Sequence, residues 1–168
     1  MNSVGFTVVS LTRDEEYVIP SAVKGFAPIE NIDNFIFSDD PTKVLYKPTA
    51  TNFPSLDSFE IINFDKESKE YELVCYQMTI SDEHDIKGIG LRTVVDLCNS
   101  QLRLDDKYAP QIKFVFVLPE TPFNTMVQDQ KIMQEKKKAY ANLENQYFTK
   151  HLVQYKVIAS EIEIPKQN

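Results

Sequence analysis

Two apolar stretches joined by a polar connection form the clearest pattern in this chain. Residues 57–62 and 73–80 are rich in aromatic and β-branched residues, which favours β-strands. The residues between them at 65–70 are all polar and suit a tight connection. The pattern therefore predicts an antiparallel hairpin.

Alternation along this hairpin assigns its side chains to two faces. Side chains two residues apart on a strand share a face, so Gln77 and Thr79 should lie together and Met78 should lie on the opposite side. If Asp57 opens the neighbouring strand, its carboxylate should reach the face that carries Gln77. Glu60 should point away from Asp57 by the same rule.

Hydrophobic spacing predicts the other elements of the chain. Apolar residues three and four apart predict a helix over about 85–102, in which Gly88 and Gly90 would each cost about 1 kcal/mol relative to alanine. That cost indicates a loop or a close-packed contact at the start of this helix. A continuous apolar run that ends at a proline is typical of a strand buried on both faces. The remaining expectations are this buried strand at 112–118, a second helix at 122–148, strands at 6–11, 16–19 and 152–159, and short extended pieces at 35–37 and 44–46.

Length and composition indicate one domain. The chain has 168 residues, of which 42% are apolar and 26% charged, as in ordinary globular proteins. We expect an α/β fold with a small mixed central sheet flanked by helices, in which residues 47–160 are the core and residues 1–46 are an extension packed on the sheet. No apolar run approaches the roughly 18 residues of a membrane helix, and the amino end lacks the pattern of a signal peptide.

Charge and cysteine usage narrow the classes of function. A net charge of -7 argues against indiscriminate wrapping by nucleic acid, because such binding depends on the neutralisation of phosphates by Lys and Arg. Cys75 and Cys98 fall in an apolar strand and an apolar helix. Both are therefore expected to be small buried hydrophobic residues rather than disulfide partners or metal ligands.

Three motifs between residues 54 and 119 together resemble one known family. The motifs are Pro54-x-x-Asp57-x-Phe59, then Gln77-x-Thr79-x-Ser81-x-x-His84-x-Ile86-Lys87-x-x-Gly90-Leu91, then Phe114-Val115-Phe116-Val117-Leu118-Pro119. In combination they resemble the carboxy-terminal domain of Crinkler effectors and the related retrotransposon-hot-spot proteins, and the resemblance covers residues 44–160. That domain is similar to restriction endonucleases of the PD-(D/E)xK fold.

The resemblance implies a Mg²⁺-dependent nuclease site with an altered motif. In that fold an Asp and an acidic residue on the next strand hold Mg²⁺, and a lysine two positions later acts on the attacking water. Asp57 matches the metal-binding Asp, while Gln77 replaces the acidic residue and Thr79 replaces the lysine. By the same resemblance Lys87 would supply the missing cation and His84 would be the acid or base. Since an amide is a weaker ligand than a carboxylate and threonine carries no charge, hydrolysis is expected to be weak or lost.

Each of these five residues also has a purely structural interpretation. Asp57 could bond to the local backbone at the entry of its strand. Gln77 and Thr79 could be polar residues on a half-buried face. His84 could cap the helix or make a satisfied hydrogen bond, and Lys87 could be a solvated side chain.

Two functional hypotheses follow. By resemblance, the chain is an effector domain with a nuclease-type fold directed at nucleic acid, with DNA as its partner and Mg²⁺ as its cofactor; Crinkler effectors are secreted and enter the nucleus of a host cell. The competing hypothesis is a catalytically inactive module that binds a host protein or a second copy of itself, which the acidic charge and the replaced Glu/Lys pair favour. An adaptor domain of unrelated family would be favoured if Asp57 and Gln77 lay on opposite faces of the sheet.

Overall fold

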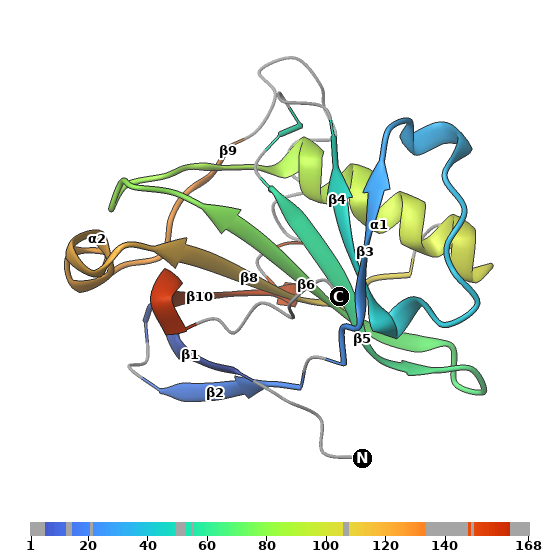
Figure 1. Ribbon diagram of the computed structural model, residues 1–168, viewed down its shortest axis with the longest axis horizontal. Coiled ribbons are helices and arrows are strands. Elements are labelled where there is room, and N and C mark those ends of the chain that lie inside the picture. The colour runs from blue at the N-terminus through green and yellow to red at the C-terminus, as the bar shows by residue number, and fades with distance from the viewer. Residues whose placement is uncertain are drawn as a thin grey trace.

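A mixed sheet of eight strands forms the centre of this computed structural model (Figure 1). The structure describes residues 6–12, 15–20, 22–49, 53–54, 56–105, 108–133, 148 and 150–161. The strand order is β2-β1-β10-β8-β6-β5-β4-β3. The strands of this sheet are β1 (Phe6–Ser10), β2 (Glu16–Ile19), β3 (Gly25–Ile29), β4 (Val44–Pro48), β5 (Ser58–Asp65), β6 (Glu70–Met78), β8 (Gln111–Leu118) and β10 (Leu152–Ile158).

Outside the main sheet, α1 (Gly88–Leu102) is the longest of the elements that the structure describes in full. A two-stranded sheet pairs β7 (Ile86–Lys87) with β9 (Ile132–Met133). Among the fully described elements, the α-helices are α1 and α2 (Glu120–Thr125), and 3-10 turns lie at 32–34, 41–43 and 159–161; residues 148, 150 and 151 are also helical. No helix in the described part of the chain is long and apolar enough to span a membrane.

The predicted hairpin is present as β5 and β6. The two strands pair antiparallel, with Ser58 opposite Tyr76. At the turn, the Asp65 carboxylate accepts hydrogen bonds from the backbone N–H groups of Glu67 at 2.7 Å and Ser68 at 3.2 Å. These backbone donors lower the pKa of Asp65 because they favour its charged form. The carboxylate of Asp65, the first residue of the polar connection, thus stabilises the turn of the hairpin.

Three neighbouring strands run parallel in the middle of the sheet. β8 pairs in parallel with β6 on one side and with β10 on the other. Parallel strands need a crossover connection, and α1 supplies the one between β6 and β8. All residues from Ile112 to Leu118 are buried, which confirms the predicted two-sided burial of this strand. In Figure 1 the arrowheads of β6 and β8 point to the same side, so one edge of the sheet collects their carboxyl ends.

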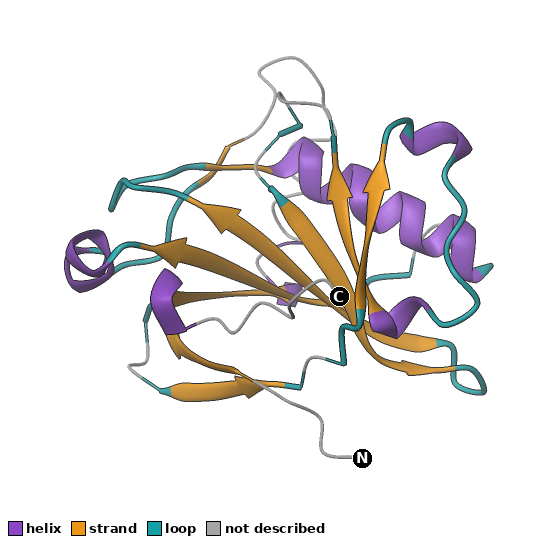
Figure 2. Ribbon diagram, in the orientation of Figure 1, coloured by secondary structure: helices purple, strands orange, loops and turns teal. Residues whose placement is uncertain are grey.

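The two faces of the sheet are buried in different ways. On one face, α1 packs its apolar residues against β5, β6 and β8, and Figure 2 shows this single long helix beside the strands. On the other face, the rings of Phe6 in β1 and Tyr76 in β6 are 5.9 Å apart although two strands separate β1 from β6. In a flat sheet that separation would be about 14 Å. The sheet therefore curls, and the β1–β2 hairpin covers part of its own second face.

This curvature changes the expected architecture. The mixed α/β class is confirmed, but the sheet is large rather than small, and the expected flanking of the sheet by helices is not confirmed. Among the described residues, α1 is the long helix that covers a face, and the buried helical residue Phe148 packs into the same core. The second helix was predicted over 122–148, whereas α2 ends at Thr125 and residues 126–133 contain no helix. Phe148 at the end of the predicted range is helical, and residues 134–147 lie outside the described part.

The amino-terminal region contributes strands to the sheet. The prediction placed residues 1–46 on top of the sheet, but β1, β2, β3 and most of β4 lie in this region and pair into it. β3 was missed because it contains a glycine and Pro28; a proline is tolerated there because β3 is an edge strand that pairs only with β4. The extended piece expected at 35–37 is not a strand. Phe37 instead stacks on Tyr46 with ring centroids 4.7 Å apart.

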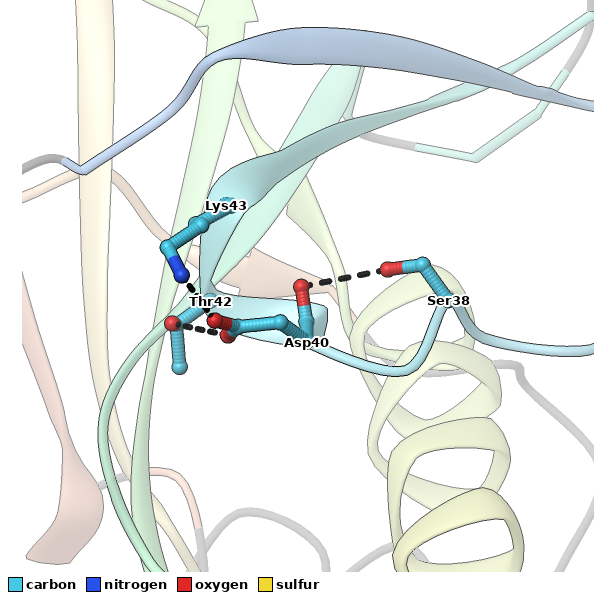
Figure 3. A network of polar contacts seen from close by, with 4 residues as sticks. All are labelled: Ser38, Asp40, Thr42 and Lys43. Carbon is cyan, nitrogen blue, oxygen red and sulfur yellow. Dashed lines mark hydrogen bonds and ion pairs between the residues drawn. The ribbon is translucent and has the colours of Figure 1, made fainter.

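A small polar network fixes the turn before β4 (Figure 3). The Asp40 carboxylate accepts a hydrogen bond from the Thr42 hydroxyl at 2.7 Å and forms an ion pair with Lys43. The Ser38 hydroxyl donates to the backbone carbonyl of Asp40 at 3.1 Å. The hydrogen bonds from Lys43 and Thr42 lower the pKa of Asp40. The network holds the chain as it enters β4, whose Tyr46 is fully buried.

The glycines at the start of α1 allow a close contact, as the sequence indicated. A Cβ atom on Gly90 would lie 1.8 Å from the backbone carbonyl oxygen of Pro54, so only glycine fits. At Gly88 the nearest atoms would be at ordinary contact distances of 3.5 Å or more. The helix begins at Gly88 rather than near residue 85, because residues 86–87 form β7 and the Ile86 N–H donates to the Lys131 carbonyl at 2.8 Å.

Candidate functional site

Asp57 and Gln77 meet at the edge of the sheet where β6 ends and β5 begins. The antiparallel register pairs Ser58 with Tyr76 and Phe59 with Cys75, which places Asp57 opposite Gln77. Phe59 and Cys75 belong to the core on the α1 side, so alternation places Asp57 and Gln77 on that same side. The two residues thus share a face, and the condition that would have favoured an unrelated adaptor domain is not met.

The Asp57 carboxylate is bonded to the end of β6 through one of its oxygens. Its Oδ2 atom accepts a hydrogen bond from the backbone N–H of Met78 at 2.6 Å and another from Nε2 of Gln77 at 3.1 Å. Gln77 Nε2 also donates to the carbonyl of Met78 at 3.2 Å. Within the described residues, neither Oδ1 of Asp57 nor Oε1 of Gln77 accepts a hydrogen bond. Two oxygens of the pair therefore remain open to a ligand.

Thr79 and His84 lie in the turn that follows β6. The Thr79 hydroxyl oxygen accepts a hydrogen bond from the Ser81 N–H at 3.1 Å and lies 3.5 Å from Nδ1 of His84, at the outer limit of hydrogen bonding. The His84 ring meets the ring of Phe116 edge-on, with centroids 6.5 Å apart. Since Phe116 is the cross-strand neighbour of Gln77, the site extends from Asp57 across Gln77 and Phe116 to His84.

Lys87 enters from the start of α1. It occupies the N-cap position of this helix in extended conformation, and its side chain is exposed while that of Ile86 before it is fully buried. The structure thus brings Asp57, Gln77, Thr79 and His84 to one edge of the sheet and places Lys87 at the neighbouring helix terminus. The approach of its ammonium group to Asp57 stays a prediction.

The donor set fits a weak Mg²⁺ site. Mg²⁺ prefers oxygen ligands and usually keeps several of its waters, so one or two protein oxygens can suffice. Asp57 Oδ1 and Gln77 Oε1 are such oxygens, but only one of them belongs to a charged group. In the part of the chain that the structure describes, no group of three or more His, Cys, Asp or Glu side chains converges as a metal site. We therefore expect loose binding with water as the main ligand.

Two buried glutamines behind His84 were missed from the sequence. Gln130 and Gln154 are 7% and 5% exposed. The Gln130 side chain accepts a hydrogen bond from the backbone N–H of His84 at 2.7 Å, and Gln154 bonds to the backbone of Gln130. A signal existed for Gln154, which is a polar residue within an apolar strand. Gln130 had no such signal, because it lies within the range 122–148 that was predicted to be a helix.

The opposite face of the same edge carries an apolar groove. This groove has a volume of about 450 Å³ and is lined by Met78, Thr79, Ile80, Val117, Pro119 and Ala159. Met78 is 62% exposed and Ile80 is 85% exposed. The end of β6 thus presents polar groups on one side and unburied apolar side chains on the other.

We found no protein-family model, curated protein or solved structure that matches this chain. The sequence motifs and the geometry of the site are therefore the grounds for a function.

Proposed function

We propose that this chain is a Crinkler-like effector domain with a nuclease-type fold directed at nucleic acid, in which Mg²⁺-dependent phosphodiester hydrolysis is weak or lost. The observation that carries the proposal is the pairing of Asp57 with Gln77 at the sheet edge, with one oxygen of each left open. The resemblance adds secretion and the nucleus of a host cell as the setting, and DNA as the partner.

Each residue of the site has a defined task in this proposal. Asp57 and Gln77 would hold Mg²⁺, which when bound neutralises charge on the phosphate. The Nε2 atom of His84, which makes no hydrogen bond with the described residues, would exchange a proton with the nucleic acid or with water. Lys87 would place its ammonium near the phosphate from the start of α1.

The engagement of Thr79 supports weak or absent hydrolysis. The Thr79 hydroxyl lies at the position where the resemblance expects a lysine. Its oxygen already accepts a hydrogen bond from the Ser81 N–H and lies beside the His84 ring. No cation on β6 itself can then stabilise charge at a phosphate. Asp57 adds to this effect, because two hydrogen bonds to Oδ2 leave a single oxygen for the metal.

Metal-dependent DNA binding and nicking test the proposal. Fluorescence anisotropy would measure the affinity for labelled DNA with Mg²⁺ and with a chelator, and supercoiled plasmid with Mg²⁺ or Mn²⁺ would report cleavage. We expect Mg²⁺-dependent binding with slow or no nicking. Asp57→Ala should weaken the Mg²⁺-dependent binding by about tenfold, which corresponds to about 1.4 kcal/mol.

The matched control is Asp39→Ala, which removes an exposed carboxylate from the loop before β4. It changes the net charge by the same amount as Asp57→Ala and should leave DNA binding unchanged. Binding that is absent, that ignores Mg²⁺, or that falls equally in both variants contradicts the proposal. Circular dichroism at the assay temperature would confirm that both variants are folded.

A second candidate is a catalytically inactive module that binds a protein or a second copy of itself. Exposed Met78 and Ile80 beside an apolar groove favour it, because large apolar side chains that gather on a surface often mark interaction sites. The net charge of -7 also favours it over DNA binding.

A further inference from the structure

Gln154 and Gln130 form a reciprocal pair that joins β10 to the segment before β9. The Gln130 N–H donates to Oε1 of Gln154 at 2.8 Å, and Nε2 of Gln154 donates to the carbonyl of Gln130 at 2.9 Å. The Gln154 side-chain amide thus pairs with the main chain of Gln130 as a neighbouring strand would. Both residues are buried, so the pair is protected from competition by water.

The Gln130 side chain continues this connection to the candidate site. Its Oε1 atom accepts the hydrogen bond from the His84 N–H at 2.7 Å, and its Nε2 atom donates to the carbonyl of Gln128 at 2.9 Å. Two residues further along, the Ile86 N–H donates to the carbonyl of Lys131 at 2.8 Å. The backbone on both sides of residue 85 is therefore held by one short segment that Gln154 anchors.

The Thr79 hydroxyl lies beside one ring nitrogen of His84, at 3.5 Å from Nδ1. Its oxygen accepts the Ser81 N–H and its single proton is available to donate to Nδ1. With that proton directed at Nδ1, Nδ1 is the acceptor and the ring proton of a neutral His84 lies on Nε2. No hydrogen bond joins Nε2 to a described residue.

We propose that Gln130, anchored by Gln154, is a positioning residue that holds His84 against Thr79 and so presents a protonated Nε2 at the edge of the sheet. The chemical task of His84 rests on the proposed function; its position and tautomer do not. The candidate site accordingly depends on β10, which contributes no residue to it directly.

Nuclear magnetic resonance on the full chain can test this proposal without metal or nucleic acid. The chain has two histidines, His84 and His151, so His151 is an internal reference. In the wild-type protein at neutral pH, ¹⁵N–¹H correlations should show His84 as the Nε2–H tautomer. The His84 backbone N–H should exchange with solvent at least about tenfold more slowly than that of Asp82, for which no hydrogen bond acceptor is described.

Two substitutions at Gln130 separate positioning from general stability. Gln130→Met removes the acceptor at similar size, so His84 should lose its single tautomer and its slow exchange while His151 is unchanged. Gln130→Glu keeps an acceptor oxygen for the His84 N–H and should restore slow exchange there. Since it loses the donor to Gln128, Gln130→Glu also distinguishes the two ends of this side chain.

Three results would overturn the proposal. They are an Nδ1–H tautomer in the wild-type protein, exchange of the His84 N–H as fast as that of Asp82, and a folded Gln130→Met variant with unchanged His84 signals. If Gln130→Met does not fold, the wild-type measurements still decide. A correct tautomer together with absent DNA binding would reject the proposed function and retain the positioning role.

Discussion

At the residue scale, the Asp57 carboxylate is compatible with both of its interpretations, the structural one as an anchor of the hairpin and the functional one as a ligand-binding group. Its Oδ2 atom bonds to the backbone of Met78 and to the Gln77 amide, which is the anchoring role expected of a strand-entry residue. Its Oδ1 atom has no hydrogen bond within the described residues. Because the anchoring hydrogen bonds use only Oδ2, they do not prevent Oδ1 of Asp57 from contacting a ligand.

The anchoring role predicts a stability effect in the absence of metal. Asp57→Ala should lower the free energy of unfolding by about 1.5–3 kcal/mol, since the backbone N–H of Met78 and the Gln77 amide lose a charged acceptor. Asp57→Asn should cost less, because its carbonyl oxygen can still accept one hydrogen bond. Urea denaturation with a chelator present would measure both values.

Asp39→Ala again provides the comparison for this experiment. An exposed carboxylate outside the hairpin should change the free energy of unfolding by no more than about 0.5 kcal/mol. Equal values for Asp57→Ala and Asp39→Ala would mean that the Asp57 bonds add nothing to stability.

Sequence alternation was sufficient for residues on paired strands and insufficient for residues joined across the fold. It placed Asp57 with Gln77 on one face and Glu60 on the other, where Glu60 accepts a hydrogen bond from the Tyr76 hydroxyl. It gave no sign of Gln130 and its bond to His84, which are separated by 46 positions. A hydrogen bond between a side chain and a backbone group far away in the sequence produces no periodic pattern of residues.

At the element scale, the start of α1 shows how a non-local contact moves a boundary. Apolar spacing extends to about residue 85, but β7 pairs with β9 and takes residues 86–87 out of the helix. The same problem affects the second predicted helix, since Ile132 and Met133 pair as a strand instead. A helical period alone cannot exclude pairing with a strand that is 46 positions away.

The two glycines of α1 provide a matched pair of substitutions. Gly90→Ala should destabilise the fold by at least about 1–3 kcal/mol, because its Cβ would lie 1.8 Å from the Pro54 carbonyl oxygen and the backbone there must move. Gly88→Ala meets atoms at 3.5 Å or more and should be neutral or stabilising by up to about 1 kcal/mol through helix propensity.

Thermal and urea unfolding of both variants would measure this difference. The two substitutions change the helix in the same way, so their difference isolates the contact with Pro54. A Gly90→Ala variant as stable as Gly88→Ala would show that α1 does not approach Pro54 so closely.

At the scale of the whole molecule, the sheet buries its second face by curvature. The sequence predicted flanking helices because segments such as residues 122–148 have a composition typical of helices. Composition alone does not show which element covers a face of the sheet. The β1–β2 hairpin covers part of that face instead, and Lys113 in β8 lies 5.0 Å from the ring centroid of Tyr17 in β2. The core on the α1 side followed the prediction more closely: Cys75 and Cys98 are buried free thiols, and burial raises the pKa of both.

The exposed apolar side chains at the end of β6 give the two functional candidates different solution behaviour. If the groove beside Ile80 binds a second copy of the chain, sedimentation velocity should show a dimer that increases with protein concentration and persists at high salt, since apolar contacts are not screened. Ile80→Lys should keep the protein monomeric without lowering its free energy of unfolding by more than about 0.5 kcal/mol.

Ile36→Lys is the control for this experiment, because Ile36 is 80% exposed against 85% for Ile80 but lies in the loop before β4. It adds the same charge to an equally exposed isoleucine and should leave the dimer intact. Loss of the dimer in both variants would assign the effect to charge rather than to the groove. A wild-type protein that is monomeric at every concentration would exclude self-association through this groove. A dimer that dissociates at high salt would indicate that charged groups, rather than Met78 and Ile80, hold the two copies together.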